Sequence, residues 1–295
     1  MKPRFSQATL WGAGSPQPRT LASLALEQPA SAMRVTVGVV AGGSVAVIGA
    51  TNNLTKWGFS TFSSLLSLYP GELYPVNRGS AEVRGVKAFA RVSEIPGPVD
   101  LAVIVVPAEE VPAVMEDCVD KGVRAGVIIS AGFAETGPEG RALQERVLTI
   151  ARKARIRLVG PNCMGMWSAR AKMSAFMFPL PIMEGPLALV SQGGNVGGSL
   201  VIDAIQRGIG FQYYVSCGGT ADLQIEDYLD YVSNRVMPDM SVRGALEKLW
   251  SASAVPGTEM TAEQLECATC GIDLPEALKS ITDKAFMIVI QDFQD

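Results

Sequence analysis

The sequence predicts an α/β protein built on a doubly wound parallel sheet, and three observations support that prediction. From residue 44 onward, short apolar runs alternate with longer amphipathic stretches. Each strand–helix unit takes about 30 residues, as in parallel sheets whose strands are joined by crossover helices. The run at 100–107 consists almost entirely of branched aliphatic residues, which is typical of a central strand buried on both faces.

The first unit is expected to contain five strands and the helices between them. The expected strands are 44–50, 72–77, 100–107, 125–130 and 156–160. The expected helices are 59–69, 109–122 and 138–154. Each informative loop follows the carboxyl end of a strand, where open α/β sheets bind their ligands.

A second α/β unit begins near residue 185 with a strand, a helix and another strand. Beyond Met240 the alternation stops, although the last residues include one more apolar run. We therefore divide the chain into an N-terminal extension (1–43), a first domain (44–170), a partial second domain (171–240) and a divergent tail of unassigned role (241–295).

Composition argues against several classes of protein. The net charge is only −4 and no basic block stands out, so nucleic acid is not an expected partner. No apolar run is long enough to span a membrane. Five cysteines in 295 residues do not suggest a disulfide framework, so we expect a reducing cytoplasm. The single Cys267-x-x-Cys270 pair is too weak a pattern to predict a metal site.

The loop at 49–58, which follows the first strand, gives the first indication of ligand chemistry. It lacks the G-x-G-x-x-G spacing of a dinucleotide site, and the second strand ends in Asn77-Arg78 rather than in an acidic residue. Thr51, Asn52 and Lys56 can hydrogen-bond a phosphate, and the following helix offers its positive end. The pattern favours NADP or coenzyme A (CoA) over NAD. A loop that only joins strand to helix remains the alternative.

A second glycine-rich segment, Ser-Gln-Gly-Gly-Asn-Val-Gly-Gly at 191–198, lies between a strand and a helix. Free amides at this helix start, together with the helix dipole, would form an anion site. Close packing of helix on sheet, which also requires small residues, is the competing explanation.

Several motifs together resemble one family. They follow one another in order and spacing over about residues 44–239, as "SVAVIGA", "LYPVN", "DLAVIVVP", "SAGFAETG", "IRLVGPNCMG" and "LALVSQGGNVGG". Together they resemble the CoA-binding and succinyl-CoA-ligase-like domains of NDP-forming acyl-CoA synthetases, a family similar to the α subunit of succinyl-CoA synthetase. The resemblance implies a Rossmann-like CoA-binding domain with a parallel sheet, followed by a partial flavodoxin-like domain.

The resemblance also implies a set of CoA-binding positions. Those that would border its phosphates are Gly49, Ala50, Thr51, Asn52 and Lys56. The adenosine end would lie near Asn77 and Arg78, and the adenine or pantetheine near Val106, Pro107 and Ala108. Gly132 would lie close to the thiol, and Asn162 would fix a loop beside the acyl or phosphoryl site.

The glycine-rich helix start would hold the phosphate of a phosphorylated histidine in this family. The residues concerned are Ser191, Gly193, Gly194 and Asn195, with Gly193 in the place of a second serine. Cys163 matches a cysteine of the family, and we interpret it as a packing residue. No residue is assigned a catalytic role.

The family joins an acid to CoA with ATP, giving acyl-CoA, ADP and phosphate, through a histidine and an ATP-grasp domain. This sequence contains no histidine, and no ATP-grasp region is visible in it. We therefore expect the CoA-binding portion of such a ligase, incomplete by itself, with CoA or acyl-CoA and an ATP-grasp β-type subunit or domain as partners. The sequence leaves open whether the protein forms a homo-oligomer. The alternatives are a non-enzymatic CoA or acyl-CoA sensor and an NADP-dependent oxidoreductase.

Overall fold

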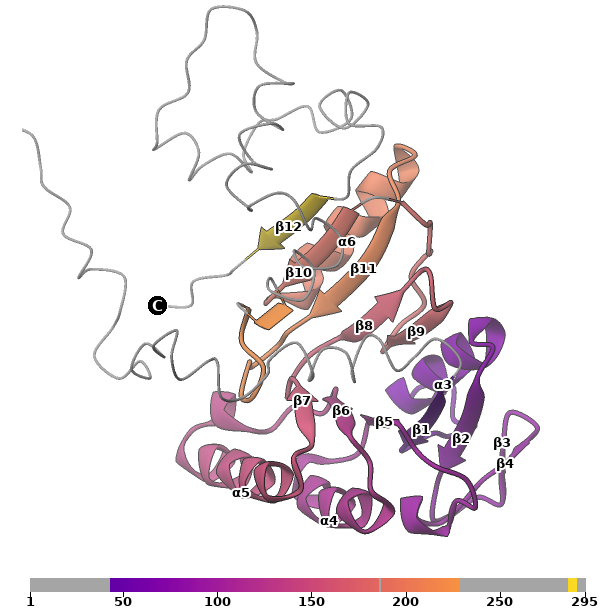
Figure 1. The fold of residues 1–295 in the computed structure, drawn as a ribbon, viewed down its shortest axis with the longest axis vertical. Coiled ribbons are helices and arrows are strands. Elements are labelled where there is room, and N and C mark those ends of the chain that lie inside the picture. Colours follow the sequence, from indigo (N-terminus) through magenta and orange to yellow (C-terminus); the bar gives the residue numbers. More distant parts are fainter. Residues whose placement is uncertain (1–42, 186, 226, 229–285, 291–295) are drawn as a thin grey trace, which may run out of the picture.

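The computed structural model describes residues 43–185, 187–225, 227–228 and 286–290, and the α/β prediction is confirmed for them. The first unit is a five-stranded parallel sheet of order β2-β1-β5-β6-β7 (Figure 1). Its strands are β1 (Ser44–Ile48), β2 (Glu72–Val76), β5 (Leu101–Ile104), β6 (Ala125–Ile128) and β7 (Arg157–Val159). Its helices are α3 (Trp57–Leu68), α4 (Val111–Lys121) and α5 (Pro138–Ala154). The N-terminal extension up to residue 42 and most of the tail lie outside the described residues.

Short elements that the sequence analysis did not predict complete the first unit. They are the hairpin β3 (Glu82–Val83) and β4 (Val86–Lys87) and the 3₁₀ turns η2 (Val92–Glu94), η3 (Ala108–Glu110) and η4 (Ala134–Thr136). The sequence explains where α4 ends and where α5 begins. α4 stops at Gly122, which adopts a left-handed conformation, and α5 begins at Pro138 in its first turn.

The apolar runs are continuous because each strand contributes to two cores. In β1, Val45 and Val47 belong to one buried cluster, whereas Ala46 and Ile48 belong to another on the opposite face of the sheet. Side chains alternate between the faces of a strand, so both parities must be apolar when both faces are covered.

The second unit is a mixed sheet of order β12-β10-β11-β8-β9. Its elements are β8 (Gly165–Ser168), β9 (Met173–Phe176), β10 (Leu187–Ser191), α6 (Gly194–Gln206), β11 (Phe211–Ser216) and β12 (Phe286–Ile290). Strands β10, β11 and β12 are parallel, and β8 and β9 are antiparallel. β8 precedes the expected domain boundary at residue 170 but pairs within this second sheet.

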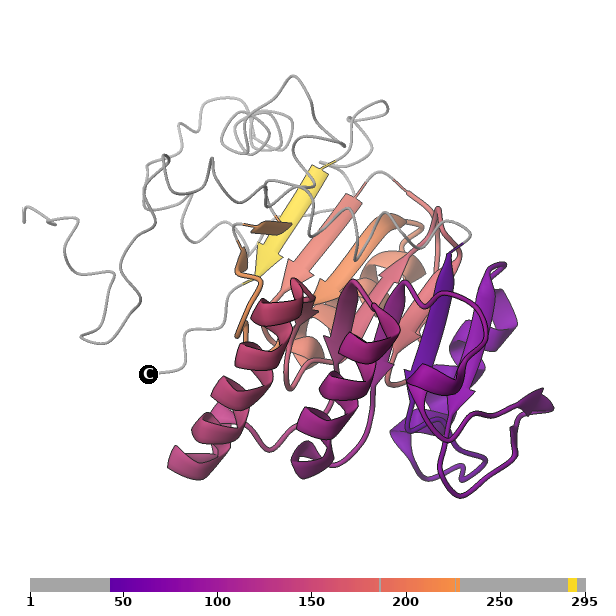
Figure 2. The same cartoon turned by 60° about the horizontal axis from the view of Figure 1, so that its bottom comes forward.

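The two sheets share one core. Val103 and Val127 from the first sheet and Val190 and Val215 from the second belong to the same buried cluster. α4 and α5 cover the outer face of the first sheet, in front of the strands in Figure 2, and α6 packs on the second sheet. The strands of both sheets are therefore anchored in one shared core.

A segment of the second unit also covers the edge of the first sheet. The amides of Ala221 and Leu223 donate to the carbonyls of Gly160 (3.1 Å) and Leu158 (3.3 Å). Asp222 accepts from Arg157 Nε at 3.0 Å and from the Leu158 amide at 2.8 Å. Residues 219–223 thus occupy the free edge of β7.

Candidate functional site

The carboxyl ends of the parallel strands open onto a cleft of about 980 Å³ that both units line. The strand order reverses between β1 and β5, and open α/β sheets bind ligands at such a switch point. Gly49 and Val106 lie on the first-unit side, and Gly193 and Ser216 on the second-unit side. We call this space the main cleft.

The start of α3 lies directly on the end of β1. A Cβ atom at Gly58 would come within 1.9 Å of the Gly49 carbonyl oxygen, so a glycine is needed there. Gly49 itself has a φ of 92°, in the left-handed region. α3 begins without a side-chain cap or an acidic residue in its first turn, and the exposed Lys56 precedes it. This end of the main cleft is therefore electropositive.

Hydrogen bonds within the loop fix its shape. The Thr51 hydroxyl accepts from the Asn53 amide at 3.2 Å, and Asn53 Oδ1 accepts from the Thr55 amide at 2.9 Å. Asn52 turns away from the main cleft, because its side chain donates to the Glu82 carbonyl (3.0 Å) and accepts from the Arg84 amide (2.9 Å). Asn52 therefore ties the loop to the β3–β4 hairpin.

The start of α6 faces the same cleft from the second unit. α6 also lacks a side-chain cap and an acidic residue in its first turn. Ser191 is buried and donates to the Gly193 carbonyl at 2.8 Å, and the Tyr214 hydroxyl donates to the Gly194 carbonyl at 3.0 Å. These bonds fix the backbone that leads into the helix. Two helix N-termini, one from each unit, thus line one cleft.

The turn at 160–165 forms the floor between these helices. Asn162 has a φ of 54°, and its amide donates to the Ser130 carbonyl at 2.9 Å. Burial raises the pKa of the Cys163 thiol to about 12, and the thiol donates to the Ile128 carbonyl at 3.3 Å. Because this thiol stays protonated at neutral pH, the structure gives it packing contacts and no activated sulfur.

Glu135 organises the loop after β6. Its carboxylate accepts from the amides of Gly132 (2.7 Å) and Phe133 (3.1 Å). Gly132 packs against the buried Ala108, since a Cβ at Gly132 would meet the Ala108 Cβ at 2.9 Å. Among the described residues that line the main cleft, Lys56 is the one cation and Glu135 the one carboxylate.

A smaller cleft of about 640 Å³ lies next to the main one and shares Gly49 and Val106 with it. Asn77 lines this smaller cleft, but its side chain donates to the Ala50 carbonyl at 2.7 Å and accepts from the Gly79 amide at 2.8 Å. Arg78 forms an exposed ion pair with Glu110 at 3.5 Å. Asn77 therefore joins the ends of β1 and β2, and Arg78 provides an exposed positive charge.

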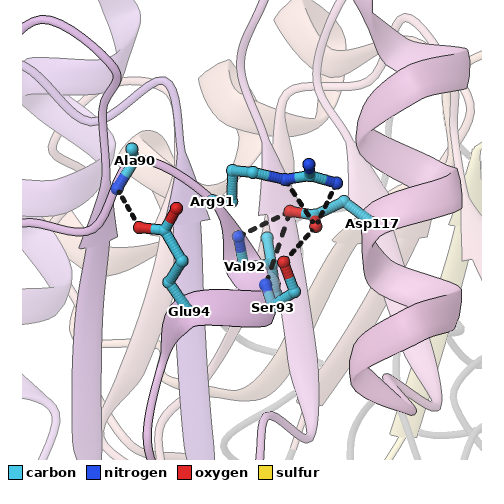
Figure 3. Close-up of polar contacts among 6 residues, drawn as sticks. All are labelled: Ala90, Arg91, Val92, Ser93, Glu94 and Asp117. Atoms are coloured by element: carbon cyan, nitrogen blue, oxygen red, sulfur yellow. Dashed lines mark hydrogen bonds and ion pairs between the residues drawn. The ribbon is translucent and has the colours of Figure 1, made fainter.

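A buried carboxylate, Asp117, also lines the smaller cleft, and Figure 3 shows its polar contacts. Asp117 accepts from the Val92 amide (2.6 Å), the Ser93 hydroxyl (2.6 Å) and Arg91 Nη2 (3.0 Å). Burial alone would raise the pKa of Asp117, but these hydrogen bonds and the guanidinium outweigh it, and the pKa is lowered. Asp117 thus anchors η2 to α4.

The structure brings most of the predicted site residues together. Those lining the main cleft are Gly49, Thr51, Lys56, Val106, Pro107, Asn162, Gly193, Gly194 and Asn195. Those of the smaller cleft are Gly49, Asn77, Arg78 and Val106. The predicted residues that line neither cleft are Ala50, Asn52, Ala108, Gly132 and Ser191.

Other lining residues were not predicted, among them Trp57, Met164, Met177, Gly218 and Gly219. Only Gly218-Gly219 carried a signal, as a glycine pair shortly after an apolar run. The described residues hold no group of three His, Cys, Asp or Glu side chains placed to bind a metal ion. No helix in that part of the chain combines the length and apolarity needed to cross a bilayer.

Two family models match the chain: a CoA binding domain over residues 43–168 and a succinyl-CoA ligase like flavodoxin domain over residues 184–242. The α subunit of an ADP-forming acetate–CoA ligase II from Pyrococcus furiosus is 42% identical over 190 residues, which are 64% of this chain and 41% of that subunit. An ADP-forming 4-hydroxybutyrate–CoA ligase from Nitrosopumilus maritimus is 35% identical over 68% of this chain and 29% of its own length.

Among solved structures, a dinucleotide-forming acetyl-coenzyme A synthetase 1 from Ca. Korarchaeum cryptofilum, in complex with phosphate and ADP, matches with a TM-score of 0.65 and 27% identity. The match covers 86% of this chain and 51% of that one. The chain thus spans about half or less of the length of these relatives.

Proposed function

Since this chain carries the CoA-binding and succinyl-CoA ligase-like domains of the NDP-forming acyl-CoA synthetase family, we propose that it binds CoA or acyl-CoA along the main and smaller clefts. It is the CoA-binding portion of a ligase that joins an acid to CoA with ATP, giving acyl-CoA, ADP and phosphate. The observation that carries this proposal is the convergence of two uncapped helix N-termini, from α3 and α6, on one cleft.

The residues present fit a ligand with several phosphates. Free amides at the start of α3 and the Lys56 ammonium suit the pyrophosphate of CoA. The described part of the chain gives Lys56 no ion pair, so its charge is available. The Thr51 hydroxyl, which already accepts from the Asn53 amide, can still donate.

The adenosine end fits the smaller cleft, which is continuous with the main one through Gly49 and Val106. There Arg78 meets the ligand phosphate near the ribose. Its ion pair with Glu110 is exposed, so exchanging that partner for a phosphate costs little. The pantetheine then runs past Val106 and Pro107 toward the floor at Asn162.

The start of α6 would hold the phosphate that is exchanged with the acyl group. Gly193, Gly194 and Asn195 offer backbone amides there, and Ser191 with Tyr214 keeps that backbone in place. None of the 295 residues is a histidine. A phosphorylated histidine and an ATP-grasp domain would therefore come from outside these residues, on a β-type subunit or a further domain.

We place this activity in the cytoplasm. The cysteines in the described part of the chain, Cys118, Cys163 and Cys217, are buried free thiols, which suits a reducing compartment.

Isothermal titration of CoA into the protein tests this function, with NADPH titrated in parallel. We expect CoA to bind and NADPH not to bind. Lys56→Ala should weaken CoA binding roughly tenfold, which is the loss of one charge-assisted hydrogen bond. Lys153→Ala is the matched control, because Lys153 is an exposed lysine on α5 outside both clefts. The proposal fails if the folded protein gives no heat with CoA, or if both variants lose affinity equally.

A further inference from the structure

We infer that Met164 and Met177 form the wall that receives the acyl chain, and that the acid substrate carries an apolar chain or ring longer than that of acetate. This inference deepens the proposed function and rests on it. It concerns the part of the main cleft between the start of α6 and the floor turn at 160–165.

The two methionines lie opposite each other in the backbone, each one residue beyond the end of the β8–β9 ladder. Gly165 pairs with Phe176 in the antiparallel β8–β9 ladder, and one step further the Met177 amide donates to the Met164 carbonyl at 3.0 Å. The Met177 side chain packs against the core that the two sheets share, whereas the Met164 side chain packs against the cluster that includes α6. Both side chains are half-buried and both line the main cleft.

Met164 also touches the start of α6. A Cβ atom at Gly194 would come within 2.3 Å of Met164 Sδ and 2.4 Å of its Cγ, so the thioether packs against the Gly194 Cα. Any anion held by the amides at 193–195 therefore has an apolar thioether as its immediate neighbour. The backbone of Met164 is held in place by Ser216, because the Met164 amide donates to the Ser216 hydroxyl at 3.1 Å.

The acyl carbon must lie between the thiol of CoA and the phosphate at α6, because it passes from one to the other. Its substituent then points away from the polar helix starts and toward the methionine pair. Buried Ile129 and Cys163 continue the apolar surface beneath it. A methionine side chain is unbranched and polarisable, so this wall adapts to chains of different shape.

The test titrates CoA, acetyl-CoA, butyryl-CoA and hexanoyl-CoA into the full chain. Affinity should rise along the series, since each buried methylene favours binding. We expect the Kd of CoA to exceed the Kd of hexanoyl-CoA roughly tenfold or more, and we call this quotient the chain-length ratio. Met164→Ala and Met177→Ala should each lower the chain-length ratio severalfold. Met183→Ala is the matched control, because Met183 is a half-buried methionine of the same unit that lines neither cleft, and it should leave the ratio unchanged.

A blocking variant keeps the test decisive if the alanine variants do not fold. Met177→Trp should weaken hexanoyl-CoA binding more than CoA binding, by filling the same space. If CoA binds but affinity does not change with acyl-chain length, this inference alone is overturned. The same holds if Met183→Ala lowers the chain-length ratio as much as Met164→Ala and Met177→Ala do. Failure of CoA itself to bind the folded protein would overturn the proposed function and this inference with it.

Discussion

Replacing Gly58 by alanine should displace the start of α3 at the main cleft, because the new Cβ would lie 1.9 Å from the Gly49 carbonyl oxygen. Cβ atoms essentially never approach other heavy atoms within 3.0 Å. The first turn of α3 must therefore move by about 1 Å against backbone that cannot yield, and such overpacking costs roughly 1–3 kcal/mol. The same shift carries the free amides away from the phosphate site, so we expect at least roughly tenfold weaker CoA binding.

Gly198→Ala provides the matched comparison within α6. Gly198 is also a buried helical glycine, but the nearest atom to an added Cβ, on Phe178, is 3.8 Å away. Here alanine should stabilise by about 0.5–1 kcal/mol, through the lower conformational entropy of the unfolded chain. Thermal unfolding and CoA titration of both variants measure these effects. Equal stability changes in the two variants, or full CoA affinity in Gly58→Ala, would refute the steric reasoning.

Three further predictions concern polar groups that are buried or partly buried. Asp117→Asn should destabilise by about 1–2 kcal/mol at neutral pH, because an amide cannot replace both acceptor oxygens. Folding lowers the pKa of Asp117, so the difference in unfolding free energy between wild type and variant should shrink as the pH falls below about 4, the pKa of an aspartate in the unfolded chain. If urea unfolding shows the same difference at every pH, this prediction is wrong. Asp222→Ala leaves Arg157 and the Leu158 amide without this acceptor, so we expect a loss of about 2–3 kcal/mol and faster amide exchange at Leu158, with unchanged exchange counting against the role. Cys163, at 4% exposure with a pKa of about 12, should resist thiol reagents until the protein unfolds, and rapid native labelling would disprove its burial.

The parallel strands, and the loops that follow them, could be predicted from the sequence alone. Strands such as Leu101–Ile104 are apolar at every position because both faces are covered, and such runs are visible without any structure. The β8–β9 hairpin escaped prediction because its strands have four residues each, and they join the second sheet only through the pairing of β8 with β11, which lies more than 40 residues further along the chain.

The orientation of individual loop side chains could not be predicted. Asn52 has the chemistry of a phosphate ligand, but its side chain bonds to backbone groups 30 and 32 residues further along the chain. Asn77 is similarly engaged with the Ala50 carbonyl. Met164 and Met177 gave no signal, because their pairing depends on a hairpin that only the tertiary structure reveals.

The segment at 219–223 has a consequence for anyone who wishes to isolate the CoA-binding unit as a module. A fragment ending near residue 170 would carry β7 without the strand-like cover that Ala221 and Leu223 supply. Its exposed edge would present unpaired amides and carbonyls to a second copy of the fragment, and such edges promote self-association. A useful module must therefore include residues 219–223 or a grafted strand that pairs with β7 in their place.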